Sequence, residues 1–98
     1  MEKLTFEYSA AKAILKRVHI GVVGPRELEI FMEPSKEKFS HVTVRTGLDG
    51  HSEMWKLLLD RFFEANNIIA NIEINDFGTT AGVVTFRLLQ ALEVSNCV

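Results

Sequence analysis

The feature that most constrains how this chain can fold is one segment whose apolar residues have helical periodicity. It lies among segments in which apolar and polar residues alternate. Its apolar residues recur at spacings of three and four, as in an amphipathic helix, and they are Met54, Trp55, Leu58, Leu59, Phe62 and Phe63. We expect this helix over about residues 51–66. An apolar stripe of this kind is buried against one face of a sheet. The predicted class is therefore α+β, with a mixed, mostly antiparallel sheet of about five or six strands and one main helix on one face.

Alternation of apolar and polar residues predicts five strands. They cover residues 2–8, 17–23, 27–33, 40–46 and 68–75, while residues 9–16 fit either a helical turn or a loop. The second and third strands flank the tight turn Gly24–Pro25–Arg26, which predicts a β-hairpin. Pro34 ends the hairpin because proline has no N–H for the ladder. The strand at 40–46, the helix and the strand at 68–75 predict a right-handed crossover unit.

The C-terminal segment admits two interpretations. Alternation over residues 82–88 favours a sixth strand that passes into a second, short helix at about 90–94. The competing interpretation is one helix over 81–94, which Thr79 or Thr80 would cap.

Length and charge limit the function classes. The 98 residues suffice for a single domain over residues 1–98, and the net charge of −2 with a pI near 5.9 argues against a nucleic-acid surface. No apolar run reaches the roughly 18 residues of a membrane span, and the N-terminus does not resemble a signal peptide. The one cysteine, Cys97, excludes an internal disulfide and a Cys-based metal site. We expect a cytoplasmic location.

Catalytic chemistry finds little support in the residues. His19, His41 and His51 are scattered, without the matched spacing that a metal site needs, and Cys97 is best explained as a chance thiol in a tail. The phosphate-binding and nucleophile-elbow glycine motifs are missing. No pairing can be demonstrated for Asp49, Asp60 and Asp76, and Glu27, Glu29 and Glu33 are most simply explained as a solvated strand face. We therefore predict no catalytic residues, no metal and a non-catalytic subunit of a larger assembly.

Two segments contain more turn-forming residues than a simple connection between strands requires. The first runs from Gly21 to Ile30 through the predicted hairpin tip, and the second runs from Ile72 to Val84 through Asp76-Phe77-Gly78-Thr79-Thr80. Ordinary turn geometry would explain the second, with Gly78 at positive φ and Asp76 accepting hydrogen bonds from the backbone that follows it. A docking surface would explain it equally well.

These two segments resemble the acyl-carrier (delta) subunit family of bacterial malonate decarboxylase, a relative of the citrate lyase acyl-carrier subunit. The family patterns are roughly V-G-S-G-D-L-E-V and D-F-G-A-T-P-G-V, and this chain has Val23 to Ile30 and Asp76 to Val83 in their places. The resemblance runs nearly end to end. It extends to Trp55, Arg87, Gln90 and Glu93, and the late motif is the more specific of the two.

The resemblance implies a carrier with a covalent arm. In the family, a serine at the hairpin tip holds a phosphoribosyl-dephospho-coenzyme A group, which carries acetyl and malonyl thioesters between subunits. The implied partners are an acyl transferase, a carboxyltransferase-like decarboxylase and an arm-attaching transferase. The attachment position corresponds to Pro25, which has no hydroxyl, and Gly24, Arg26 and Glu27 form the implied docking turn. The late motif, Asp76, Phe77, Gly78, Thr79 and Thr80, completes the implied site.

Three hypotheses follow from these observations. The chain is a delta-type subunit of a malonate decarboxylase system with a lost or altered attachment. Alternatively, it is a paralogue without the arm, which acts as a structural or regulatory interaction module. The third hypothesis is an unrelated small enzyme that uses Asp76 or the histidines.

Overall fold

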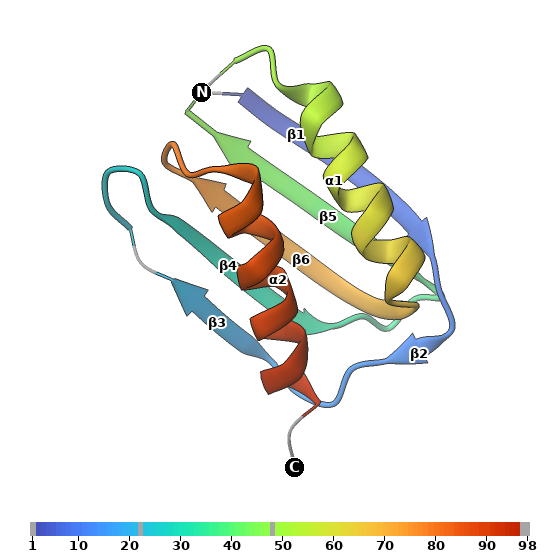
Figure 1. Ribbon diagram of the computed structural model, residues 1–98. Helices are drawn as coiled ribbons and strands as arrows, with labels where there is room; N and C mark the ends of the chain where they lie inside the picture. The colour runs from blue at the N-terminus through green and yellow to red at the C-terminus, as the bar shows by residue number, and fades with distance from the viewer. Residues whose placement is uncertain (1, 22, 48, 97–98) are drawn as a thin grey trace.

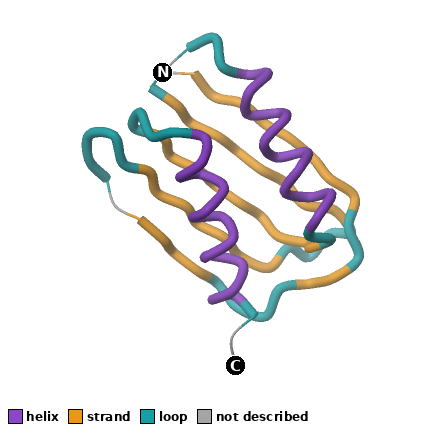
Figure 2. The backbone as a smooth tube through the Cα atoms, in the orientation of Figure 1, coloured by secondary structure: helices purple, strands orange, loops and turns teal. Residues whose placement is uncertain are grey.

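The computed structural model describes residues 2–21, 23–47 and 49–96. Over these residues the chain forms an α+β fold with six strands and two helices (Figures 1 and 2). The strands are β1 (Glu2–Ser9), β2 (Lys12–Ala13), β3 (Val18–Gly21), β4 (Leu28–Pro34), β5 (Phe39–Thr46) and β6 (Ile68–Asp76). The helices are α1 (Ser52–Ala65) and α2 (Ala81–Ser95). Neither helix is long and apolar enough, among the described residues, to cross a membrane.

The sheet is mixed, as predicted, with the strand order β1-β5-β6-β4-β3. β5 and β6, which precede and follow α1 in the sequence, pair in parallel. This confirms the predicted strand–helix–strand crossover. The pairs β1–β5, β4–β6 and β3–β4 are antiparallel. Residues 9–16, expected as a helical turn or a loop, form no helical turn; they contain the short strand β2, which pairs in parallel with the beginning of β6.

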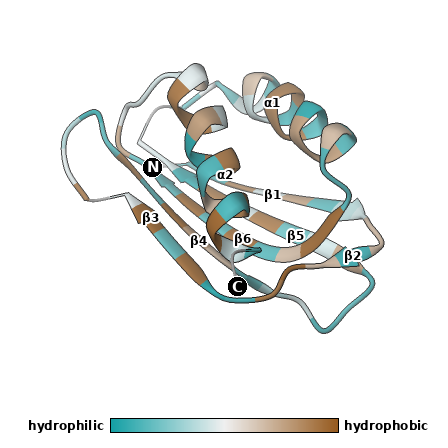
Figure 3. Ribbon diagram, turned by 60° about the horizontal axis from the view of Figure 1, so that its bottom comes forward, coloured by the Kyte–Doolittle hydropathy of each residue, from teal (hydrophilic) through white to brown (hydrophobic). Residues whose placement is uncertain are grey.

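Both helices cover the same face of the sheet, and the opposite face is open to solvent (Figures 1 and 3). This arrangement follows from the alternation of the strands. Val42 and Val44 of β5 and Ile72 and Ile74 of β6 point into the core, and the residues between them are only half-buried. Trp55, with 1% of its surface exposed, is among the largest fully buried side chains of this core.

The preferred interpretation of residues 82–88 as a sixth strand is wrong, because this segment belongs to α2. Val84 and Leu88 are four residues apart, so they share one side of a helix and are both buried, whereas Phe86 is 64% exposed. β6 already has β5 and β4 as neighbours on its two edges. A helix that returns over the sheet instead covers the apolar face of β3 and β4. Thr80, one of the two predicted caps, accepts a hydrogen bond from the Val83 N–H at 3.4 Å.

The other predicted boundaries agree with the structure to within a few residues. The main helix begins at Ser52 and ends at Ala65. Pro34 is the last residue of β4 and lies opposite Ala70. Of the strand predicted at 17–23, the structure forms β3 over Val18–Gly21, and position 22 lies outside the described residues.

Candidate functional site

The turn predicted between the two hairpin strands exists and is exposed. It connects β3 to β4, and Val23, Pro25, Arg26 and Glu27 are all exposed, Val23 by 69%. The Glu27 N–H donates to the Gly24 carbonyl at 3.1 Å and closes the turn. These residues, 23–27, are called the hairpin tip below.

Arg26 adopts a left-handed backbone conformation, with φ of 61°. It is the only non-glycine residue in the described part of the chain with a positive φ. Glycine adopts this conformation at no steric cost, whereas a side chain at Cβ makes it unfavourable. The family resemblance places a glycine at this position, and glycine suits the backbone conformation that Arg26 adopts here.

Two backbone hydrogen bonds join the late motif to the hairpin tip. The Arg26 N–H donates to the Phe77 carbonyl at 2.9 Å, and the Phe77 N–H donates to the Glu27 carbonyl at 3.0 Å. These bonds continue the β4–β6 ladder beyond its last pair, Leu28 and Asp76. A Cβ atom on Gly78 would lie 3.9 Å from the Arg26 Cα. The two segments that carry the family resemblance therefore form one continuous structure.

Asp76 connects this structure to the rest of the sheet. Its carboxylate is buried, and one oxygen accepts hydrogen bonds from the Gly78 N–H at 3.1 Å and the Thr79 N–H at 3.0 Å. The other oxygen accepts the Thr46 hydroxyl at 2.8 Å, and the Asp76 carbonyl accepts the Gly47 N–H at 3.2 Å. The connections that follow β3, β5 and β6 thus lie together at one end of the sheet (Figure 1).

This geometry confirms the turn interpretation of the late motif, since Gly78 has φ of 104° and Asp76 bonds the backbone that follows it. The docking role of the motif stays a prediction. Sequence reasoning missed Thr46, because a hydroxyl at the end of a strand gives no local sign of a partner thirty positions away.

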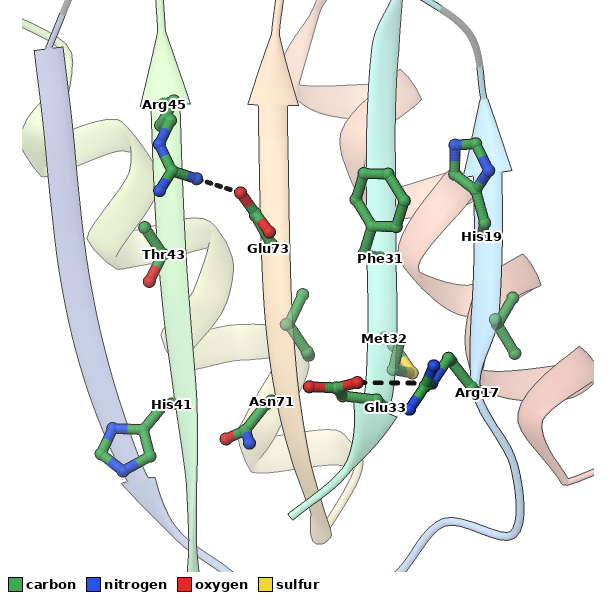
Figure 4. A pocket seen from close by; sticks show the side chains of 12 residues that line it. Arg17, His19, Phe31, Met32, Glu33, His41, Thr43, Arg45, Asn71 and Glu73 are labelled. Carbon is green, nitrogen blue, oxygen red and sulfur yellow. Dashed lines mark hydrogen bonds and ion pairs between the residues drawn. The ribbon is translucent and has the colours of Figure 1, made fainter.

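The three histidines do not form a cluster, although His19 and His41 line opposite sides of one hollow (Figure 4). His19 lies on the open sheet face, where it stacks on Phe31 and contacts Glu29 at 3.0 Å. His41 contacts Glu37 at 3.1 Å, and His51 is exposed before α1. The described residues contain no group of three or more His, Cys, Asp or Glu side chains that could hold a metal. Cys97 lies outside the described residues.

A second feature, which the sequence did not indicate, is a hollow of about 700 Å³ on the open sheet face. Figure 4 shows its labelled side chains, which come from β3, β4, β5, β6 and the residue before β3. Its charged groups are paired with one another. Arg45 contacts Glu73, and Arg17 lies 3.4 Å from Glu33. The charges of the hollow are therefore largely neutralised within the chain.

Comparisons with known proteins agree with the resemblance. The family model of the malonate decarboxylase delta subunit (MdcD) matches residues 15–95. The chain is 42% identical over 98 residues to the malonate decarboxylase acyl carrier protein of Azotobacter vinelandii, covering 98% of this chain and 99% of that one. It is 39% identical over 94 residues to the protein of that name from Stutzerimonas stutzeri, covering 95% of each chain.

A solved structure is similar over nearly the whole chain. A chain in a crystal structure of a Pseudomonas malonate decarboxylase hetero-tetramer in complex with malonate superimposes with a TM-score of 0.90 at 36% identity. The similarity covers 96% of this chain and 98% of that one. The family consists of acyl-carrier subunits, which agrees with the prediction of a non-catalytic subunit. The chain therefore belongs to the malonate decarboxylase delta subunit family of acyl-carrier proteins.

Proposed function

We propose that this chain takes the acyl-carrier position in a malonate decarboxylase assembly and docks on partner subunits through the hairpin tip. The partners in this proposal are the acyl-transferase subunit and the carboxyltransferase-like decarboxylase subunits. The similar solved chain belongs to a malonate decarboxylase hetero-tetramer, which supports partners of this kind. A cytoplasmic location, expected from the sequence, is part of the proposal.

The observation that carries the proposal is the hydrogen-bonded structure formed by the tip and the late motif. A docking surface must hold its shape before the partner arrives, because ordering a loop on binding weakens the complex. Here the backbone bonds between Phe77 and residues 26 and 27 hold an exposed turn against the sheet, and Asp76 holds the turn beneath it. The side chains of Pro25, Arg26 and Glu27 are left exposed for contact.

The hairpin tip does not fit the covalent arm that the family resemblance implies. A phosphodiester link requires a hydroxyl, and residues 23–27 (Val, Gly, Pro, Arg and Glu) contain none. Pro25 is exposed at the attachment position, and the other side chains of the tip also lack a hydroxyl. The tip therefore supplies docking contacts and no attachment point.

This mismatch favours the second candidate function, a paralogue without the arm that acts as a structural or regulatory interaction module. Such a subunit would keep the fold and the docking surface and would carry no acyl group itself. A carrier function would instead require an attachment elsewhere in the chain.

Co-expression with the malonate decarboxylase subunits of the native host, followed by intact-mass measurement and peptide mapping, tests both candidates. We expect a complex of fixed stoichiometry in which this chain has the mass of its unmodified sequence. A mass increment of coenzyme A size, mapped to any residue of this chain, would establish a carrier with a relocated attachment. Failure to form any complex with these subunits would contradict the proposed function.

Restoring the family residues at the tip should restore attachment. We expect the double variant Pro25→Ser, Arg26→Gly to gain the arm when incubated with the family's arm-attaching transferase, because an exposed hydroxyl then stands at the tip next to a residue suited to the left-handed turn. The single variant Arg26→Gly is the control and should keep its mass. No incorporation by a transferase that modifies its own family subunit would show that the hairpin alignment is wrong.

A further inference from the structure

A groove between α1 and α2, on the side of the molecule away from the open sheet face, has the apolar lining of a protein-binding site. Its volume is about 380 Å³, and apolar side chains from both helices line it, among them Met54, Leu57, Phe62 and Leu89. α2 lies beside α1 over the same face of the sheet (Figure 3), and side chains of both helices line the groove.

The apolar side chains of the groove remain unusually exposed. Leu57 of α1 is 54% exposed and Leu89 of α2 is 46% exposed. Phe86, three residues before Leu89 on the same helix, is 64% exposed and extends the apolar surface beyond the groove. Contiguous apolar surface of this kind on a small protein marks an interaction site more often than isolated exposed leucines do.

Small residues allow a close approach to the backbone of both helices. Ala65 lies on the α1 side of the groove, and Ala81 and Gly82 lie on the α2 side. A Cβ atom added to Gly82 would meet nothing within 4 Å. A helix or strand of a partner can therefore approach the backbones of α1 and α2 closely and contact Leu57 and Leu89 together.

The groove also presents one unpaired positive charge. Arg61 is the only ionisable residue that lines it, and within residues 2–21, 23–47 and 49–96 Arg61 has no hydrogen bond or ion pair. Lys56 on the same helix, by contrast, pairs with Asp60 at 2.9 Å. On the open sheet face, Arg17 contacts Glu33, His19 contacts Glu29 and Arg45 contacts Glu73. The groove thus presents a guanidinium that is available to a carboxylate of a partner.

We propose that the α1–α2 groove seats an amphipathic helix of a malonate decarboxylase partner subunit, which places apolar side chains against Leu57 and Leu89 and a carboxylate against Arg61. This inference rests on the proposed function and adds a second contact surface to the hairpin tip. A helix with apolar residues at spacings of three and four fits an apolar groove of this shape. A second copy of this chain, packed groove to groove, is a poorer occupant because the lining offers no acid to either Arg61.

The double variant Leu57→Gln, Leu89→Gln tests the apolar part of the groove. Both side chains are half exposed and glutamine is a good helix former, so the fold should persist, as a circular dichroism melt would verify. We expect the Kd for the assembled partner subunits of the native host to rise at least about 30-fold. The matched control is Val94→Gln, an exposed residue of α2 outside the groove, which should change Kd less than about threefold.

The variant Arg61→Gln tests the charge, with Lys56→Gln as the matched control on the same helix. We expect Arg61→Gln to slow association at low salt and to reduce the salt dependence of the association rate, because an unpaired surface charge steers a charged partner. Lys56→Gln should retain most of the salt dependence of the wild type.

Each outcome bears on one of the two proposals. If the wild-type chain assembles and the double variant assembles equally well, the groove inference is wrong and the proposed function stands. If the isolated chain forms a dimer that the double variant abolishes, the groove belongs to a second copy and the inference is again wrong. If the wild-type chain binds none of the partner subunits, the proposed function fails and the groove inference fails with it.

Discussion

At the scale of single residues, the backbone conformation of Arg26 is imposed by the contacts of the hairpin tip. Arg26 is exposed, it has a left-handed φ of 61°, and its N–H is held by the Phe77 carbonyl. The surrounding bonds maintain a conformation that an arginine adopts only at a cost. The shape of the hairpin tip therefore depends on its neighbours and not on the preference of the residue itself.

Replacing Arg26 with glycine should stabilise the protein. Removing the Cβ relieves the left-handed conformation, which outweighs the greater freedom of glycine in the unfolded chain, so we expect a gain of about 0.5–1 kcal/mol in the free energy of unfolding. Urea denaturation measures this gain. Arg26→Ala keeps the Cβ and serves as the control, which should show no gain. Equal stabilisation by both variants would mean that the arginine side chain, and not the backbone angle, is unfavourable.

At the scale of elements, one buried carboxylate organises the end of the sheet where the candidate site lies. Asp76 ends β6, joins the end of β5 through Thr46, and bonds the backbone of the turn that leads into α2. The same turn pairs with the hairpin tip through Phe77. Loss of this carboxylate would loosen three connections together.

We expect Asp76→Ala to destabilise the protein by about 2–4 kcal/mol, because it removes the carboxylate that accepts the Thr46 hydroxyl and two N–H groups of the turn. Asp76→Asn keeps one carbonyl oxygen that can accept the turn N–H groups, so it should cost less than half as much. Thermal unfolding of the two variants measures the difference. Equal losses for alanine and asparagine would contradict the role of the turn hydrogen bonds.

A second tie between elements joins β1 to α1. The Tyr8 hydroxyl donates to Asp60 at 2.7 Å, and the Tyr8 ring stacks on Phe63 at 4.3 Å. Burial, together with the bond to Asp60 and its negative charge, raises the pKa of Tyr8 well above its usual range. The bond from Tyr8, together with the ammonium of Lys56, lowers the pKa of Asp60.

These shifts predict how stability depends on alkaline pH. A raised folded-state pKa means that the stabilisation from Tyr8 is complete below the unfolded-state pKa of about 10 and is lost as the pH rises above it. We expect the free energy of unfolding to fall between about pH 10 and pH 12 in the wild type. The decline should be weaker in Tyr8→Phe, which keeps the stacked ring. Parallel pH profiles for the two proteins would rule out Tyr8 as the titrating group.

At the scale of the whole molecule, two helices and one sheet face share a single core. Trp55 of α1 is fully buried in it, and its Nε1 has no hydrogen-bond partner among the described residues. Its contribution is therefore packing rather than hydrogen bonding. In a chain of 98 residues, one side chain of this size fills a large share of the interior.

We expect Trp55→Ala to reduce the free energy of unfolding by about 3–5 kcal/mol, because it leaves a large void that a small core cannot close. Trp55→Phe retains most of the volume and loses no hydrogen bond within the described residues, so it should cost clearly less. Denaturant unfolding measures both. A loss below about 1 kcal/mol for the alanine variant would mean that Trp55 does not support the core.

Most of the elements could be predicted from the sequence, because periodicity directly reports which side of an element is apolar. The stripe from Met54 to Phe63 predicted α1, and the alternation in each long strand predicted its buried face. The prediction of a strand at residues 82–88 was wrong for a physical reason. Val84 and Leu88 lie on the same side of both a helix and a strand, and only the exposure of Phe86 separates the two interpretations.

The sequence by itself determined the class of fold, the turn at Gly24–Pro25–Arg26, the absence of a hydroxyl in the hairpin tip and the family to which the chain belongs. Only the tertiary structure decided that α2 is a helix, that Phe77 bonds the hairpin tip, that Thr46 reaches Asp76, and that Arg61 lines an apolar groove. The physical reason is the distance along the sequence over which each interaction acts. Periodicity and turn chemistry act over a few residues, whereas these contacts join elements that are distant in sequence and meet only when the helices pack on the sheet.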